Sequence, residues 1–525
     1  MNYGVYGGAF DPFHDGHMSV IRGAIKSEKI DRLIVVPTGM PVFKNSRDLT
    51  PAPYRYYMVK NALKDIPECT VSPVEILDEN PSYTVNTMSE LIREEKAGSA
   101  DRWFLIVGAD VVFEFESWYM PDQIMSLATL LVASRPGFQE GERLRKTKEI
   151  ADRFNGDVDF FEIDPVDVSS SVIRENNDFS MVPEEVRSFV SANGLYPLDR
   201  PLHRVSDSAF DRFIGCLRIL FSELSEKRLL HSLNTAVLSA RYAIRFNENP
   251  DQALIAGLLH DCAKELSLEE QRKMAGDVDK DDSSIIEMIH APAGAGYAKT
   301  RYGVSEEEIL RAIAYHTTGR AHMSGIEKIV YLADKLEPSR KFDDLSEIRR
   351  LVQTDLDAAM FECLTAVRDS LERKGMIFHK DSHEALQVLI SEKEQREKLE
   401  ERMDSKKISE TISEILNEKK ASNLDVVYVR NKTVIADYFV VATGTSTTHV
   451  KALADEVAFV MKDQYRIIPE RIEGISTSRW ILIDYRDVVV HIFHPEEREN
   501  YSLEKLWATR PEDPMIADGL SDIKN

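Results

Sequence analysis

The chain has 525 residues, of which 43% are hydrophobic and 30% charged, which excludes a wholly disordered protein. At roughly 150 residues per domain this length predicts three or four domains. The 66 basic and 89 acidic residues leave a net charge of −23, and because this field repels phosphate we expect no direct DNA binding. The four cysteines are scattered without a CxxC pair, which favours a reducing, cytoplasmic location.

The first segment, residues 1–200, alternates short apolar runs with helical patterns. Strands are expected at 33–36, 103–107 and 129–132, and helices around 17–28, 54–65 and 86–96. This alternation predicts a Rossmann-like α/β domain whose parallel sheet is covered on both faces. The chain starts without the basic and apolar regions of a signal peptide, and no apolar run is long enough to span a bilayer, so we expect no membrane partner.

The remaining chain changes character twice. Residues 205–396 carry apolar residues at helical spacing with almost no strand signal, which predicts an all-α domain. A charged run at 391–407 predicts a solvated linker helix, and we take 397–407 as the linker. Residues 408–525 return to a mixed α/β pattern, followed by a polar tail. Their expected elements are helices from 408 and over 446–463, and strands at 424–430, 438–443, 480–484 and 488–493. The three segments share no motif, so the sequence predicts a fusion of three unlike domains.

A glycine-rich turn with two histidines follows the first expected strand. Gly7 and Gly8 allow a sharp turn and a close approach of backbone N–H groups to a ligand. A helix starting near His17 adds oriented donors, and His14 lies three residues earlier, so both imidazoles can share one side of the first turn. The pattern indicates a site for a nucleoside triphosphate. The alternative is a pair of ordinary histidines at a helix start.

A second polar cluster lies near the end of this segment, where Ser169, Ser170 and Ser171 precede an apolar helix start. Three hydroxyls there can be a simple N-cap. Arg174, expected in the first helical turn, does not fit a cap alone, because a cation there opposes the helix dipole. An anionic ligand explains it.

The two motifs, GGxFxPxHxGH and the late SSxxIR, resemble those of the HxGH nucleotidylyltransferases. The stretches 41–44, 82–84, 108–110, 118–119 and 134–137 narrow this resemblance to the bacterial nicotinate-mononucleotide adenylyltransferases. It implies that nicotinate mononucleotide attacks ATP, giving deamido-NAD and pyrophosphate, with Mg²⁺ bridging the phosphates. Pantetheine-phosphate adenylyltransferases share the HxGH chemistry but lack the Trp-Tyr and Ser-Tyr-Thr features.

The resemblance assigns roles to individual residues. Catalysis would fall to His14, His17 and Arg174. Phosphate binding would involve Gly7, Gly8, Phe10, Lys44, Ser170 and Arg174, and nicotinate mononucleotide would contact Thr84, Asp110, Trp118 and Arg135. Two departures, Phe43 in place of a histidine and Asn86 in place of an aspartate, leave the preference for nicotinate over nicotinamide open.

Six potential metal ligands are scattered through the helical segment. Each lies in apolar helical context, where an unpaired polar side chain is costly; they are His231, His260, Asp261, His290, His316 and Asp334. One buried histidine is usually a satisfied core residue, but four with two aspartates are hard to explain in that way. Imidazole with carboxylate suits iron, manganese or similar metals. An aspartate bridging two such ions would supply an activated hydroxide for attack on a phosphate ester.

The order of these ligands resembles the HD superfamily of metal phosphohydrolases, and the surrounding residues resemble its YqeK-type branch. The resemblance implies symmetrical hydrolysis of diadenosine tetraphosphate to two ADP, with two bound ions of iron or another transition metal. Lys264, Glu337 and Arg340 would contact substrate phosphates or support the ligands, the alternative being surface charges. A nucleotide phosphatase or a cyclic-nucleotide phosphodiesterase of the same superfamily is the second interpretation.

The third segment offers no nucleophile paired with a base. Its stretches 437–446, 473–474, 480–485, 487–491 and 501–507 resemble the ribosomal silencing factor family (RsfS, also called Iojap). The resemblance implies binding to a protein of the large ribosomal subunit, which blocks subunit joining. Trp480, Asp484 and Tyr485 are our interface candidates, with sheet packing as the alternative. The alternative interpretation is that the chain is a ribosome-regulating interaction protein whose enzyme domains are degenerate or act on other nucleotides. The intact set of His14, His17 and Arg174 and the six potential metal ligands argue against it.

Overall fold

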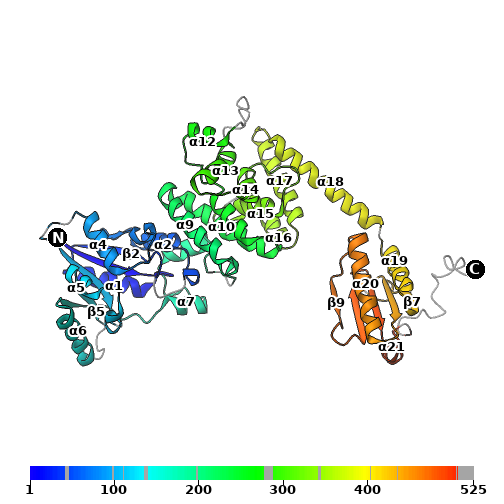
Figure 1. The fold of residues 1–525 in the computed structure, drawn as a ribbon, viewed down its shortest axis with the longest axis horizontal. Helices are drawn as coiled ribbons and strands as arrows, with labels where there is room; N and C mark the ends of the chain where they lie inside the picture. Colours follow the sequence, from blue (N-terminus) through cyan, green and yellow to red (C-terminus); the bar gives the residue numbers. More distant parts are fainter. Residues whose placement is uncertain are drawn as a thin grey trace, which may run out of the picture. The chain divides into compact units, whose positions relative to one another are not determined.

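The computed structural model forms two compact units, Met1–Leu389 and Ile390–Asn525. It describes residues 1–41, 46–96, 98, 100–109, 111–134, 140–196, 199–276, 288–340, 345–402, 404–433, 435–503 and 505. The expected boundary near residue 200 lies inside the first unit, so each unit is taken by itself below (Figure 1).

A six-stranded sheet opens the first unit, with strand order β3-β2-β1-β4-β5-β6 and parallel pairing throughout. The strands are β1 (Asn2–Gly8), β2 (Arg32–Pro37), β3 (Cys69–Val71), β4 (Arg102–Gly108), β5 (Thr129–Ser134) and β6 (Val158–Glu162). The chain moves outward from β1 to β3 on one side, then returns to β4 and continues on the other. The order therefore reverses between β1 and β4, which is where ligands bind in open α/β sheets. The predicted Rossmann-like fold is confirmed.

Helices cover both faces of this sheet. They are α1 (Asp15–Lys26), α2 (Ala52–Leu63), α3 (Val74–Leu77), α4 (Thr84–Glu94), α5 (Pro121–Leu127), α6 (Glu140–Phe154), α7 (Ser170–Asn176) and α8 (Glu184–Ala192), with short 3-10 turns at 46–48, 111–113, 115–117 and 201–204. Alternate strand residues face opposite layers: Leu33 and Val35 share a core with α1, α2 and α8, whereas Ile34 and Val36 share one with α4, α5 and α6.

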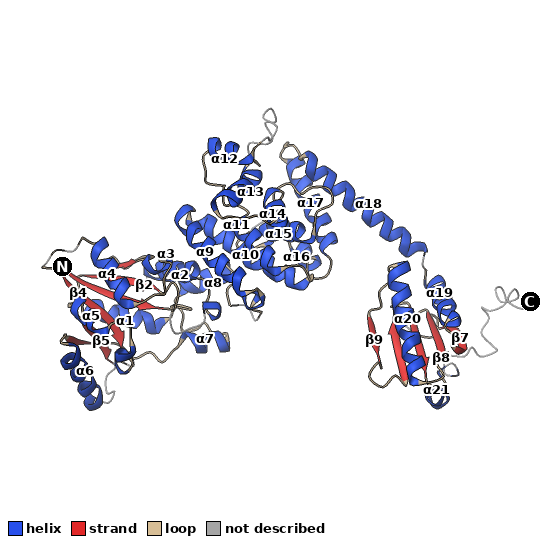
Figure 2. Cartoon of the chain, in the orientation of Figure 1, coloured by secondary structure: helices blue, strands red, loops and turns tan. Residues whose placement is uncertain are grey.

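The rest of the first unit is helical, as predicted (Figure 2). Its helices are α9 (Asp207–Glu223), α10 (Glu226–Arg245), α11 (Pro250–Leu259), α12 (Leu268–Ala275), α13 (His290–Arg301), α14 (Glu307–Ala314), α15 (Gly325–Leu336), α16 (Ser346–Leu351) and α17 (Leu356–Arg373). The boundary between the units, at Leu389, falls within α18 (Lys380–Arg402). One continuous core joins α9, α10, α11, α13, α14 and α15 to the sheet, with Met58 of α2 and Phe213 of α9 in the same cluster. The rings of Tyr56 and Phe221 meet at 5.4 Å across this junction.

The second unit is a small mixed sheet with helices on one face. Its elements are α19 (Ser405–Glu418), β7 (Ser422–Tyr428), β8 (Tyr438–Thr443), α20 (Thr447–Tyr465), β9 (Arg471–Glu473), β10 (Trp480–Asp484), β11 (Val488–Phe493) and α21 (Pro495–Tyr501). The strand order is β7-β8-β11-β10-β9, and only the β8–β11 pair is parallel. Ile412 of α19 and Val457 of α20 are fully buried in the helix-side core. Among the helices described, none combines the length and apolar character needed to cross a membrane.

Candidate functional site

His14 and His17 lie together at the start of α1, as their spacing predicts. Their rings stack with centroids 3.7 Å apart, and the backbone N–H of His14 donates to Nδ1 of His17 over 3.2 Å. A Cβ at Gly16 would lie only 3.0 Å from the His14 ring, so the glycine between the histidines permits this packing. Burial lowers the pKa of His14 to about 4. The pKa of His17 is also lowered well below its ordinary value, mainly by burial and to a smaller extent by repulsion from His14. Both imidazoles are therefore neutral at pH 7.

The turn before them is built differently from our expectation. Its left-handed residue is Phe10, with φ of 51°, while Gly7 and Gly8 end β1 with ordinary φ values. A Cβ at Gly8 would lie 3.0 Å from the Phe10 ring, so the glycine makes room for the phenylalanine. The Phe10 side chain is buried and packs edge-on against His17 at 4.9 Å. Phe10 thus positions His17, and any phosphate contact of its own falls to its backbone.

A cavity of about 410 Å³ opens beside the histidines. It lies at the carboxyl ends of β1, β4 and β6, and its lining includes Gly108, Ile163 and Asp164 as well as both imidazoles. This is the point where the strand order reverses, and the volume suits a nucleotide. Ile163 and Asp164 were not among our predicted residues, because nothing in their sequence surroundings distinguishes them.

The late serine cluster docks onto the same turn. Ser169 caps α7 by accepting from the N–H of Val172, and Ser170 donates to the carbonyl of Pro12 over 3.0 Å. Arg174 donates to the carbonyl of Asp11 and lies 3.6 Å from its carboxylate. Its expected place was wrong: Arg174 lies in the last turn of α7 and not the first, so the dipole argument for an anion does not apply. Asp11 explains the cation.

The residues assigned to nicotinate mononucleotide are only partly described. Lys44, Asp110 and Arg135 lie outside the described residues. Thr84 begins α4, and Trp118 is partly buried against Phe115, with centroids 5.5 Å apart. The rings of their neighbours Tyr83 and Tyr119 meet at 4.5 Å, which brings the two segments side by side.

The six scattered ligand candidates of the helical region converge at one buried place. His231 comes from α10, His260 and Asp261 follow α11, His290 begins α13, His316 follows α14, and Asp334 lies in α15. Nε2 of His231 lies 3.1 Å from Nε2 of His260 and 3.0 Å from Oδ1 of Asp334. The Nδ1 atoms of His260 and His316 each pair with a backbone carbonyl at 2.7 Å, so their Nε2 atoms point inward.

Asp261 stands between two groups of these ligands. Its Oδ2 lies 3.7 Å from Nε2 of His231 and 3.5 Å from that of His260. Its Oδ1 lies 3.4 Å from Nε2 of His290 and 3.5 Å from that of His316. Oδ1 is buried and has no hydrogen-bond partner in the part of the chain that the structure describes. A carboxylate with one oxygen in each of two histidine groups fits a bridge between two metal ions.

The electrostatics suit cation binding. Burial opposes ionisation of Asp334, but Lys335 and hydrogen bonds with His231 and His260 hold the pKa of its carboxyl well below its usual range. Burial is likewise outweighed at Asp261, where His260 and His316 lower the pKa. Both carboxylates are therefore charged at neutral pH.

Besides Lys335, which lies 3.4 Å from Asp334, three further cations contact the cluster. Arg340 contacts Asp334 at 2.8 Å, and Lys264 contacts His290 at 2.8 Å, so two of the predicted supporting residues reach it. Arg228, which the sequence gave no reason to choose, pairs with Asp261. Glu337, the third predicted residue, is buried and meets Nδ1 of His231 at 3.1 Å. It supports a ligand and does not face solvent.

The interface candidates of the second unit differ from one another. Trp480 is partly exposed, and its ring stacks on Phe493 at 4.9 Å. Asp484 is also partly exposed and pairs with Arg471 at 3.2 Å. Tyr485 is buried in the helix-side core, so the surface role expected for it is wrong and sheet packing accounts for it.

Three family models match the chain in succession. They are the cytidylyltransferase-like model at residues 5–176, the HD domain model at 228–339 and the model for the ribosomal silencing factor during starvation at 402–524. A probable nicotinate-nucleotide adenylyltransferase of Clostridium acetobutylicum is 32% identical over 197 residues, which cover 37% of this chain and 97% of the relative.

Other similar proteins extend into the helical region. A probable nicotinate-nucleotide adenylyltransferase/Ap4A hydrolase of Mycoplasma genitalium is 28% identical over 353 residues, which cover 66% of this chain and 92% of the relative. A crystal structure described as that of a "predicted HD superfamily hydrolase involved in NAD metabolism" from Clostridium acetobutylicum is 35% identical; the match covers 34% of this chain and 96% of that protein and has a TM-score of 0.32. Through its first 197 or so residues, the chain belongs to the nicotinate-nucleotide adenylyltransferase family, and it carries an HD domain and a ribosomal silencing factor segment behind them.

Proposed function

We propose that the first segment, about residues 1–200, transfers the adenylyl group of ATP to nicotinate mononucleotide. The observation that carries this proposal is the stacked pair His14–His17 at the start of α1, beside the cavity where the strand order reverses, in a segment of this family. ATP enters as its Mg²⁺ complex, with Gly7, Gly8, Lys44 and Ser170 as further phosphate-binding residues.

The chemistry follows from charge and position. A phosphate oxygen of nicotinate mononucleotide forms the new bond to the α-phosphorus, while the bond from that phosphorus to the β-bridging oxygen breaks and pyrophosphate leaves. Charge grows on the leaving oxygens, and N–H donors from His14, His17 and the first turn of α1 stabilise it. Thr84, Asp110, Trp118 and Arg135 would hold the nicotinate nucleotide in line for this attack.

The test is pyrophosphate release by the purified chain with MgATP and either nicotinate or nicotinamide mononucleotide. Release with the nicotinate form should fall about 100- to 1,000-fold in His17→Ala, as for loss of one transition-state donor. His383→Ala changes an exposed histidine of α18 and should leave the rate unchanged. Equal rates with both mononucleotides, or an unaltered rate in His17→Ala, contradicts the proposal.

For the helical segment, about residues 205–396, we propose symmetrical hydrolysis of diadenosine tetraphosphate to two ADP. The six-ligand cluster would hold two divalent ions, with Asp261 offering one carboxylate oxygen to each histidine group and iron as the expected metal. When bound, such ions would supply a nucleophile from water at neutral pH and neutralise phosphate charge. Lys264, Arg340 and Arg228 would bind the polyphosphate.

The product pattern tests this proposal. ADP as the sole nucleotide product supports the symmetrical cut, whereas ATP with AMP refutes it. Asp261→Ala should abolish turnover, because it removes an oxygen from each ligand group. Asp369→Ala, at an exposed position on α17, is the matched control and should retain the wild-type rate.

We propose that the third segment, about residues 408–525 after a linker at 397–407, binds a protein of the large ribosomal subunit and blocks subunit joining. Its support is the family match at 402–524, with Trp480 and Asp484 as the remaining interface candidates. Co-sedimentation with isolated large subunits tests it: the intact chain should pellet with them and slow the addition of small subunits.

A further inference from the structure

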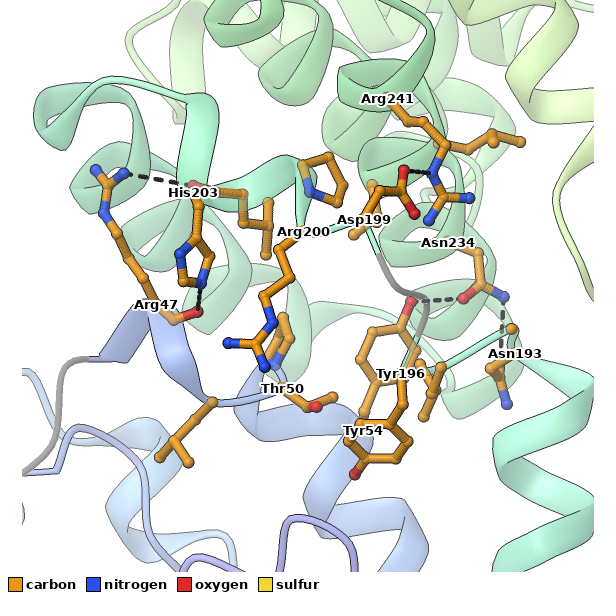
Figure 3. Close-up of a pocket in the computed structure, with 18 of the residues that line it drawn as sticks. Arg47, Thr50, Tyr54, Asn193, Tyr196, Asp199, Arg200, His203, Asn234 and Arg241 are labelled. Carbon is orange, nitrogen blue, oxygen red and sulfur yellow. Dashed lines mark hydrogen bonds and ion pairs between the residues drawn. The ribbon is translucent and has the colours of Figure 1, made fainter. Parts of the chain in front are cut away.

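A buried chain of hydrogen bonds runs from α2, which packs against the six-stranded sheet, to His231 in the six-ligand cluster. It begins at Tyr54 on α2, whose hydroxyl meets Oδ1 of Asn234 on α10 at 2.5 Å, although 180 residues separate the two (Figure 3). Nδ2 of Asn234 donates to Oε2 of Glu337 over 3.0 Å, and Oε1 of Glu337 meets Nδ1 of His231 at 3.1 Å. Tyr54, Asn234 and Glu337 are 2%, 3% and 0% exposed, so solvent does not compete for these bonds.

The direction of each bond is fixed by chemistry. The Glu337 carboxylate only accepts, so the amide nitrogen of Asn234 must face it. The other hydrogen of this amide goes to Oδ1 of Asn193, 3.1 Å away (Figure 3). Oδ1 of Asn234 therefore faces Tyr54, and the phenol must donate. Within this arrangement Tyr54 supplies the donor that holds the amide of Asn234 in one orientation.

The far end of the chain acts on a ligand. With Glu337 accepting at Nδ1, a metal-bound His231 would keep its proton on that nitrogen and offer the lone pair of Nε2 to the ion. Glu337 is held in turn by Ser339, whose hydroxyl and backbone N–H lie 2.5 and 2.8 Å from it, and by Asn234. Removal of the Tyr54 hydroxyl leaves Oδ1 of Asn234 buried without a donor and allows the Asn234 amide to rotate. This weakens the hydrogen bond by which Asn234 holds Glu337.

We propose that Tyr54, a residue of the adenylyltransferase segment, is a positioning residue for the metal cluster of the HD segment. The inference rests on the proposed use of that cluster to bind metal. It means that the outer shell of the hydrolase site is completed by a side chain from the neighbouring enzyme segment.

The test uses the full-length chain freed of metal and titrated with Co²⁺. Tyr54→Phe should weaken Co²⁺ binding about 3- to 10-fold and shift the visible absorption bands of the bound ion, since supporting residues tune affinity by up to about 100-fold. Tyr57→Phe removes a hydroxyl from the same buried face of α2, near the same junction but outside the chain of bonds, and should match the wild type in both measurements. Adenylyl transfer should be unchanged in both variants.

A second variant separates positioning from general damage. Asn234→Leu is similar in shape but removes the donor to Glu337, and should weaken Co²⁺ binding at least as much as Tyr54→Phe. Because both act through one chain of bonds, the double variant should bind Co²⁺ no more weakly than Asn234→Leu alone. Additive losses, or wild-type affinity and spectrum in Tyr54→Phe, overturn the proposal.

Failure of the hydrolase proposal gives a different result. If the wild type binds Co²⁺ but leaves diadenosine tetraphosphate intact, the substrate is wrong while the Co²⁺ titrations still decide the role of Tyr54. If the wild type binds no divalent ion, the metal site and this inference are both refuted.

Discussion

Arg55 on α2 binds the turn at Ala9 and Phe10, and its replacement gives the sharpest test of the proposed phosphate site. The guanidinium is 1% exposed and donates to three carbonyls, those of Thr50 at 2.7 Å, Ala9 at 2.8 Å and Thr38 at 2.6 Å. Lysine keeps the charge but reaches from a single point, so Arg55→Lys loses two of the three bonds. At about 1.5–3 kcal/mol for each charged hydrogen bond, we expect a loss of about 3–6 kcal/mol in stability.

Differential scanning calorimetry of the full-length chain measures this loss. The midpoint of the first unit, Met1–Leu389, should fall by about 4–7 °C, because an unfolding entropy of about 2 cal/mol/K per residue gives about 1.2 °C per kcal/mol for a unit of this size. Pyrophosphate release should also fall about tenfold or more, because Ala9 precedes the left-handed Phe10 that packs on His17. The exposed pair Arg93–Glu90 provides the control, and Arg93→Lys should leave both measurements unchanged. A transition within 2 °C of the wild type in Arg55→Lys would refute the reasoning.

Three further predictions follow from burial and charge. The pKa of His14 in the folded protein, about 4, lies below its ordinary value of 6.5. The neutral imidazole therefore contributes fully to the free energy of unfolding above pH 6.5, and this contribution is lost as the pH falls towards 4. In denaturant titrations, the wild type should lose more stability over that range than His14→Gln, by at most about 3 kcal/mol. Removal of metal by chelation and dialysis, followed by Mg²⁺, should abolish hydrolysis of diadenosine tetraphosphate and spare both adenylyl transfer and ribosome binding. Tyr485→Ala should destabilise the second unit by about 3 kcal/mol in urea titrations without changing adenylyl transfer.

The sequence predicted the elements that carry strong periodic signals. The buried strands β2, β4 and β5 and the helices α1, α2 and α4 lie within a few residues of their expected positions. The sequence analysis named neither β3 nor β9, each of three residues, because such short strands give no measurable alternation. These strands form only because a neighbouring strand pairs with them.

Site residues with chemically distinctive side chains in motifs were predictable, and those that act through distant contacts were not. His14 and His17 reveal themselves by spacing. Asp11 does not, although its buried carboxylate accepts from the Tyr196 hydroxyl at 2.8 Å and the Thr50 N–H at 3.2 Å. Partners 185 and 39 residues away leave no local pattern. The sharp turn was expected at Gly7 and Gly8 because glycine is the usual left-handed residue, and only tertiary packing reveals that Phe10 takes this conformation.

The junction near residue 200 shows that two segments with different sequence patterns can still pack as one compact unit. Tyr54 and Arg55 are consecutive on α2, so their side chains diverge by about 100°; one meets Asn234 of the helical region and the other meets the turn at Ala9. A single core continues across the same junction. An HD segment without this neighbour must satisfy Oδ1 of Asn234 by another donor, because a buried acceptor without one costs about 1–3 kcal/mol. The change in sequence pattern near residue 200 therefore marks the boundary between two proposed activities, although the two segments pack as one unit.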